Sequence, residues 1–96
     1  MNPEIEGYHE IKAVDLAIQR LPDNVAQSFL LDVDLQELEV AMKGFEEVTK
    51  KKIIKNVSED LAGVIADDMM HLGPVRIKDV KYACLNIYKE LVKLYD

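Results

Sequence analysis

Apolar residues near the carboxyl end of the chain recur at alternating steps of three and four. The set is Ile77, Val80, Cys84, Ile87, Leu91 and Leu94. Because an α-helix has 3.6 residues per turn, this spacing places the whole set on one helix face. A helix with one such face buries it against other helices, as in a coiled-coil-like seam. The pattern therefore predicts a long helix over about residues 77–94 that packs on neighbouring helices.

Shorter stretches of the same periodicity precede this segment. They predict helices over about residues 11–21, 24–31, 35–42, 46–57 and 59–72. Residues that stop a helix separate them: Pro22 lacks the backbone amide, and Gly73-Pro74 ends the fifth segment. We expect Gly44 to end the third segment in a left-handed conformation.

Polar residues at the starts of these segments are suited to capping. Asp34 and Ser58 each precede an apolar stripe, and Asp23 and Asn24 follow Pro22. Their side-chain oxygens accept hydrogen bonds from the free amides of a first helical turn.

No segment has the strict alternation of a half-buried strand, and the connections are short. We expect an all-α fold, a compact bundle of five to six short helices over residues 10–96, with residues 1–9 as a flexible tail.

Size and charge narrow the class of protein. The 96 residues have room for one core, and a formal net charge of −6 argues against general binding to nucleic acid or anionic membranes. The longest apolar run, residues 61–66, is far shorter than the roughly 20 residues of a membrane-spanning helix. The amino terminus lacks the apolar stretch of a signal peptide, and a single cysteine suits a reducing compartment. These features predict a cytoplasmic protein without direct membrane insertion.

The sequence lacks the common motifs of enzymes. It contains no phosphate-binding glycine loop, no nucleophile elbow and no C-x-x-C pair. Asp67 and His71, four residues apart on one helix face, would supply two metal ligands, whereas protein metal sites need three or four. Cys84 lies on the apolar seam, where a thiol acts as a small hydrophobe. We expect no enzymatic activity and no cofactor, with the Asp67/His71 pair as the only support for an enzyme.

Charged residues gather at two places. Lys50, Lys51, Lys52 and Lys55 form the densest basic patch, which we interpret as a solvated helix face. On the segment from Ser58 to Leu72, the side chains of Asp60, Asp67 and His71 fall within about 40° of one another around the helix axis. Asp68 lies about 80° from Asp60, toward the apolar side. Carboxylates along one ridge repel one another, so the ridge suits a cationic partner; the alternative is a solvated acidic face.

Six short motifs are spread along the chain between residues 21 and 76. They are Leu21-Pro22-Asp23, Asp32-Val33-Asp34, Ala41-Met42-Lys43-Gly44, Lys55-Asn56-Val57-Ser58, Ala66-Asp67-Asp68-Met69 and Gly73-Pro74-Val75-Arg76. In the order and spacing of these motifs, residues 21–96 resemble the C-terminal domain of the flagellar motor switch protein FliG, and the resemblance has no gap. The combination is far more specific than any one motif alone.

The resemblance implies an all-helical bundle whose charged torque helix faces the cytoplasmic loop of the stator protein MotA. It also implies other switch-complex proteins as partners and a place at the inner-membrane flagellar basal body. Lys43, Asp67, Asp68 and Arg76 match the charged residues of the family. Asp60 departs from the family, which usually has a basic residue there. We expect these five residues to form the partner-binding charged face.

Two further differences between this chain and the family support an alternative hypothesis for its function. Where the family has its Met-Phe-x-Phe hinge, this chain reads Lys12-Ala13-Val14-Asp15, which has a helical pattern. The family's amino-terminal and middle domains have no counterpart in these residues. The chain is therefore either a divergent stand-alone paralogue or a fragment, and the absent hinge favours the former. The main hypothesis is a rotor-type interaction module, and the alternative is a stand-alone adaptor or regulator outside a flagellar motor.

Overall fold

The computed structural model describes residues 7–95, and within this range the chain forms six α-helices and no strand. The helices are α1 (Tyr8–Arg20), α2 (Asp23–Asp32), α3 (Leu35–Met42), α4 (Glu47–Lys55), α5 (Glu59–Leu72) and α6 (Ile77–Lys93). The connections between them are two to four residues long. The predicted all-α class and the short connections are confirmed.

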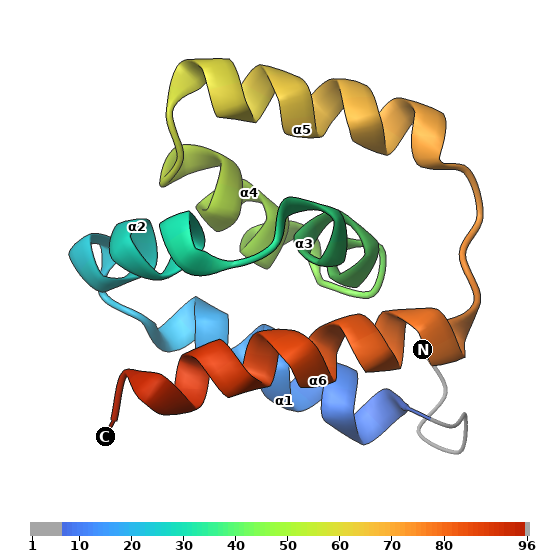
Figure 1. The fold of residues 1–96 in the computed structure, drawn as a ribbon, viewed down its shortest axis with the longest axis horizontal. Coiled ribbons are helices and arrows are strands. Elements are labelled where there is room, and N and C mark those ends of the chain that lie inside the picture. The colour runs from blue at the N-terminus through green and yellow to red at the C-terminus, as the bar shows by residue number, and fades with distance from the viewer. Residues whose placement is uncertain (1–6, 96) are drawn as a thin grey trace.

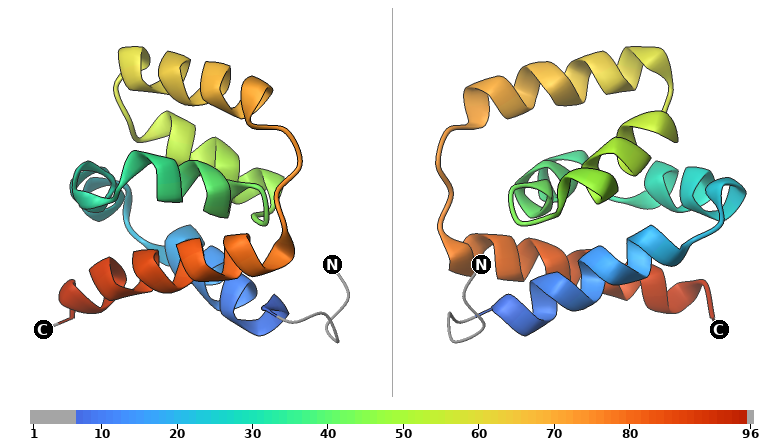
Figure 2. Two further views of the ribbon diagram at one scale, coloured as in Figure 1. Left: turned by 45° about the vertical axis from the view of Figure 1, so that its right-hand side comes forward. Right: turned by 180° about the vertical axis from the view of Figure 1, so that it is seen from behind.

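The helices lie in three levels (Figure 1). α1 and α6 cross at one side of the molecule, α2, α3 and α4 occupy the middle, and α5 lies at the opposite side. α6 packs chiefly on α3 and α1, whereas α5 packs on α3 and α4. An extended connection over residues 73–76 links α5 to α6 along one edge (Figure 2). α5 therefore packs chiefly on α3 and α4, which precede it in the sequence, and not on α6, which follows it.

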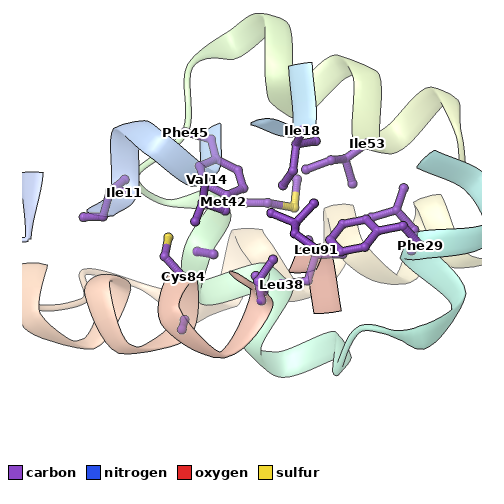
Figure 3. Close-up of a cluster of buried hydrophobic side chains, with 14 of the residues drawn as sticks. Ile11, Val14, Ile18, Phe29, Leu38, Met42, Phe45, Ile53, Cys84 and Leu91 are labelled. Carbon is purple, nitrogen blue, oxygen red and sulfur yellow. The ribbon is translucent and has the colours of Figure 1, made fainter. Parts of the chain in front are cut away.

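The apolar face of α6 lies in the centre of the core, as predicted (Figure 3). Val80, Cys84, Ile87 and Leu91 are all at most 3% exposed. Burial, helped by the negative charge of Asp15, raises the pKa of the Cys84 thiol to about 12, so this cysteine belongs to the core. The seam ends earlier than predicted, since Leu94 follows the last helical residue and is 38% exposed.

Two of the three predicted caps are confirmed. The side chain of Asp34 accepts a hydrogen bond from the Glu37 amide at 3.0 Å, and that of Ser58 accepts one from the Leu61 amide at 3.1 Å. The prediction for α2 is wrong, because Pro22 occupies the cap position and Asp23 is the first helical residue. The Asp23 carboxylate instead binds the end of α4, through the Asn56 amide at 3.1 Å and the Lys55 ammonium at 3.3 Å.

Gly44 has a different role from the predicted one. The positive-φ glycines of the described chain are Gly7 and Gly73, so the left-handed assignment of Gly44 is wrong and the Gly73 stop is confirmed. A β-carbon on Gly44 would lie 2.8 Å from Val80 Cγ1 and 2.9 Å from Ile11 Cγ2. This position needs glycine because α1 and α6 approach the backbone there.

The start of α1 also differs from the prediction. Residues 1–6 of the expected tail lie outside the described residues, but positions 8 and 9 belong to α1. The helix begins after Gly7, which has φ 91° and is buried; a β-carbon there would lie 2.9 Å from Lys81 Cβ. The first residue of α1, Tyr8, therefore lies two residues before position 10, where the domain was predicted to begin, and Gly7 before it contacts α6.

α4 is held against α1 by polar groups that the sequence analysis did not identify. Asp15 is 1% exposed, and its carboxylate accepts hydrogen bonds from the Glu46 amide at 3.1 Å, the Thr49 hydroxyl and Gln19 Nε2 at 3.2 Å. A side chain of α1 therefore caps the amino terminus of α4.

The basic patch of α4 is only partly the predicted solvated face. The Lys52 ammonium donates hydrogen bonds to the carbonyl oxygens of Gln19, at 2.7 Å, and Leu21. It therefore binds the carbonyl end of α1, where a positive charge is favourable. Lys51 remains exposed, so the four lysines have different roles.

Candidate interaction surface on α5

α5 is the least buried of the long helices. Ile65 is its one fully buried residue, while Leu61 and Met69 are half-buried against the core. The apolar spacing of this segment predicts an inward stripe of Leu61, Ile65, Met69 and Leu72; the first three face the core, and Leu72 is half-buried at the end of the helix. The remainder of the helix faces outward, including Met70, which is 82% exposed. The fold holds α5 along one narrow stripe and leaves most of its circumference free for contact.

The predicted acidic ridge lies on this free circumference. Asp60, Asp67 and Asp68 are all exposed. His71 Nδ1 lies 2.8 Å from the Asp67 carbonyl oxygen and 3.8 Å from Asp67 Oδ1. Within residues 7–95 no group of three or more acidic, histidine or cysteine side chains is arranged to hold a metal ion. The ridge is thus a row of charges suited to long-range attraction of cations.

The other two predicted site residues lie outside α5. Arg76 is exposed and precedes α6, at the end of the extended connection. Lys43 caps the carboxyl end of α3 and is half-buried; it lines a hollow together with Tyr8, Lys12 and other residues of α1 and the α3–α4 connection. No residue of α5 lines that hollow. The three aspartates therefore share one helix, whereas Lys43 belongs to a separate hollow.

A groove of about 520 Å³ separates α3 from α5. Its polar lining includes Glu39 of α3 and the Asp68 and His71 side chains of α5. Glu39 is 5% exposed, and its Oε2 atom has no hydrogen-bond partner. Burial, together with a hydrogen bond to Asp68 and the charge of Asp68, raises the pKa of Glu39 to about 7.

Glu39 is not among the site residues predicted from the sequence. Its position four residues after Leu35 places it on the inward side of α3, where an acidic residue is out of place. An acidic residue at an inward-facing helix position is the sequence feature by which Glu39 could have been recognised. Its pairing with Asp68 depends on the packing of α5 over α3, which no local pattern predicts.

The described helices include none that is both long and apolar enough to cross a membrane. 

The chain matches the sequence model of the FliG C-terminal domain over residues 15–96. It is 39% identical over 77 residues to the flagellar motor switch protein FliG of Thermotoga maritima, which covers 77% of this chain and 23% of that protein. It is 38% identical over 74 residues to FliG of Borreliella burgdorferi, with 77% of this chain and 22% of that protein covered. For FliG of Vibrio cholerae the identity is 34% over 91 residues, with 82% and 26% covered.

The chain thus spans about a quarter of the length of these relatives. The match begins inside α1 and includes every later helix, so it covers most of the core and the whole of α5. On this evidence, the chain belongs to the FliG C-terminal domain family.

Proposed function

We propose that this domain is a non-enzymatic rotor module of a flagellar motor switch, which presents α5 to the cytoplasmic loop of the stator protein MotA. The observation that carries the proposal is the free acidic ridge of α5 in a domain of this family. The domain would act in the cytoplasm, beside the inner membrane at the flagellar basal body. Other switch-complex proteins would be its further partners.

The charges suit a contact that forms and breaks repeatedly. Asp67 and Asp68 are exposed and adjacent, so they attract a cationic group from a distance without a large desolvation cost. Arg76 would pair with an acidic group of the same partner, and Lys43 would make a separate contact. Charge complementarity at an exposed interface chiefly sets the association rate and the choice of partner.

Asp60 would adapt this interface to a particular stator. It is exposed in the first turn of α5, where a negative charge is also favourable for the helix. A stator carboxylate at this position would be repelled, whereas a stator lysine or arginine would be attracted. We therefore propose that the partner of this domain carries a basic group opposite Asp60.

Two observations favour a second candidate function, a stand-alone adaptor that binds a different protein. One is the acidic residue at position 60. The other is α1, which continues as a helix through residues 12–15, where the family has a hinge. A genome that encodes this protein without flagellar genes would support the adaptor and contradict the motor function.

The test is a calorimetric titration of the domain with the host MotA cytoplasmic loop at low and moderate salt. We expect salt-sensitive binding that Asp67→Lys and Arg76→Glu abolish. Asp32→Lys, which changes an exposed charge on α2, is the matched control and should leave the affinity within about threefold of the wild type. A folded domain that binds the loop at neither salt concentration contradicts the motor function and redirects the search to other partners.

A further inference from the structure

We propose that the groove between α3 and α5 receives one basic side chain of the partner, which binds between the carboxyl groups of Glu39 and Asp68. The inference rests on the proposed function, because it assigns the partner's cation a binding site. It extends the interaction surface from α5 to a buried residue of α3.

The first support is the burial of Glu39. The side chain is 5% exposed and Oε2 has no hydrogen-bond partner, although it lines a groove that is open to solvent. A buried carboxylate without a cation or a donor is strongly unfavourable. The group therefore needs either a proton or an external cation.

The second support is the neighbour of Glu39. Asp68 lines the same groove, and its hydrogen bond and its charge both raise the pKa of Glu39, because two ionised carboxylates close together repel each other. Glu39 therefore keeps its proton to a higher pH than an exposed glutamate does. The groove is lined by neither lysine nor arginine, so no basic group of its lining can replace this proton. A basic group of the partner can do so.

The shape of the groove suits a long basic side chain. Leu35, Val40 and Leu72 supply apolar surface for the methylene groups, and the two carboxyl groups supply acceptors for the charged end. Lysine and arginine bury their stems in this way while the charge reaches polar groups. Arginine is the better fit, because its planar guanidinium presents several donors to two acceptors at once.

The proton balance gives the inference a measurable consequence. In the free domain Glu39 holds a proton below about pH 7; in the complex the cation takes its place and the proton leaves to solvent. Below about pH 7, binding should therefore release up to one proton, whereas well above pH 7 it should release none. The affinity should be about tenfold higher at pH 8.5 than at pH 6, because protons no longer compete with the cation.

His71 is the other titratable side chain that lines the groove. Its protonation at low pH would also oppose a cation, so it must be separated from Glu39 experimentally. The variant His71→Gln should keep the proton release and most of the pH dependence. If His71→Gln instead removes both, the titrating group is the histidine and the inference is wrong.

The experiment is calorimetry of the MotA loop with the intact domain at pH 6 and pH 8.5, each in two buffers of different ionisation enthalpy. The wild type should release between about half a proton and one proton at pH 6. Glu39→Gln, a neutral isostere, should abolish this release and the tenfold pH effect. Glu47→Gln, an exposed acid of α4, is the matched control and should retain both.

Carboxyl carbon NMR of the wild-type domain at pH 6 provides a measurement that does not depend on a variant folding. Addition of the loop should move the Glu39 signal from the protonated toward the ionised position. Binding without this change and without proton release overturns the inference but leaves the proposed function intact. Absence of loop binding at every pH and salt concentration overturns both.

Discussion

The carboxylate of Asp15 in α1 accepts a hydrogen bond from the backbone amide of Glu46, 3.1 Å away, at the start of α4. It also accepts one from the Thr49 hydroxyl in the first turn of that helix. A helix usually takes its cap from the residue before it, but Glu46 forms no side-chain cap here. α4, one of the two helices on which α5 packs, therefore depends on α1 for its amino-terminal cap.

We expect Asp15→Ala to lower the free energy of unfolding by about 2–3 kcal/mol, because it leaves a buried hydroxyl and a helix-start amide without their acceptor. Urea denaturation followed by circular dichroism measures this loss. Asp32→Ala, an exposed site on α2, should stay within about 0.5 kcal/mol of the wild type. Equal stability of the two variants would show that Asp15 does not support α4.

A pair of glycine substitutions tests the close approach at Gly44. Gly44→Ala should destabilise the domain by about 1–3 kcal/mol, since its β-carbon would meet side chains of Val80 and Ile11 at under 3 Å. Gly63→Ala adds the same atom to α5, where nothing lies within 4 Å, and should stabilise the domain by about 0.5–1 kcal/mol. Thermal unfolding of both variants should therefore shift in opposite directions.

Two neighbouring lysines of α4 should differ in their effects. Lys52→Met removes the donor to two carbonyl groups at the end of α1, and we expect a loss of about 1–2 kcal/mol in chemical denaturation. Lys51→Met changes the charge equally at an exposed position and should be nearly neutral. The contrast would be absent if the basic patch were only a solvated face.

Glu39 should make the stability depend on pH. Its pKa is raised to about 7 from an ordinary value of 4.5, so between these values the folded domain binds more protons than the unfolded chain. The unfolding free energy should therefore fall as pH rises from about 4.5 to 7, by at most about 1.4 kcal/mol per pH unit for this group. The contribution of Glu39 is fully present below this window and lost above it.

The measurement is the difference in unfolding free energy between wild type and Glu39→Gln, taken at half-unit steps from pH 4.5 to 8. The difference isolates this group from the lowered pKa values of Asp23 and Glu46, which arise from their hydrogen bonds to Asn56 and Lys12. A difference that stays constant with pH would mean that Glu39 ionises normally in the folded domain.

The sequence alone was sufficient to predict the features that depend on neighbouring residues within about one helical turn. The α6 stripe, the Asp34 and Ser58 caps and the Gly73 stop are of this kind, because helical periodicity, capping and a glycine-proline stop are properties of a few consecutive residues. The orientation of α5 followed in the same way from its apolar spacing.

Only the tertiary structure decided the roles of Asp15, Gly44, Lys52 and Glu39. Asp15 meets Thr49 across 34 positions of the chain, and Lys52 meets Gln19 across 33. Gly44 is crowded by α1 and α6, and Glu39 is paired by the packing of α5. Hydrogen bonding, close packing and desolvation depend on which groups the folded chain brings together, and a one-dimensional pattern does not contain those distances.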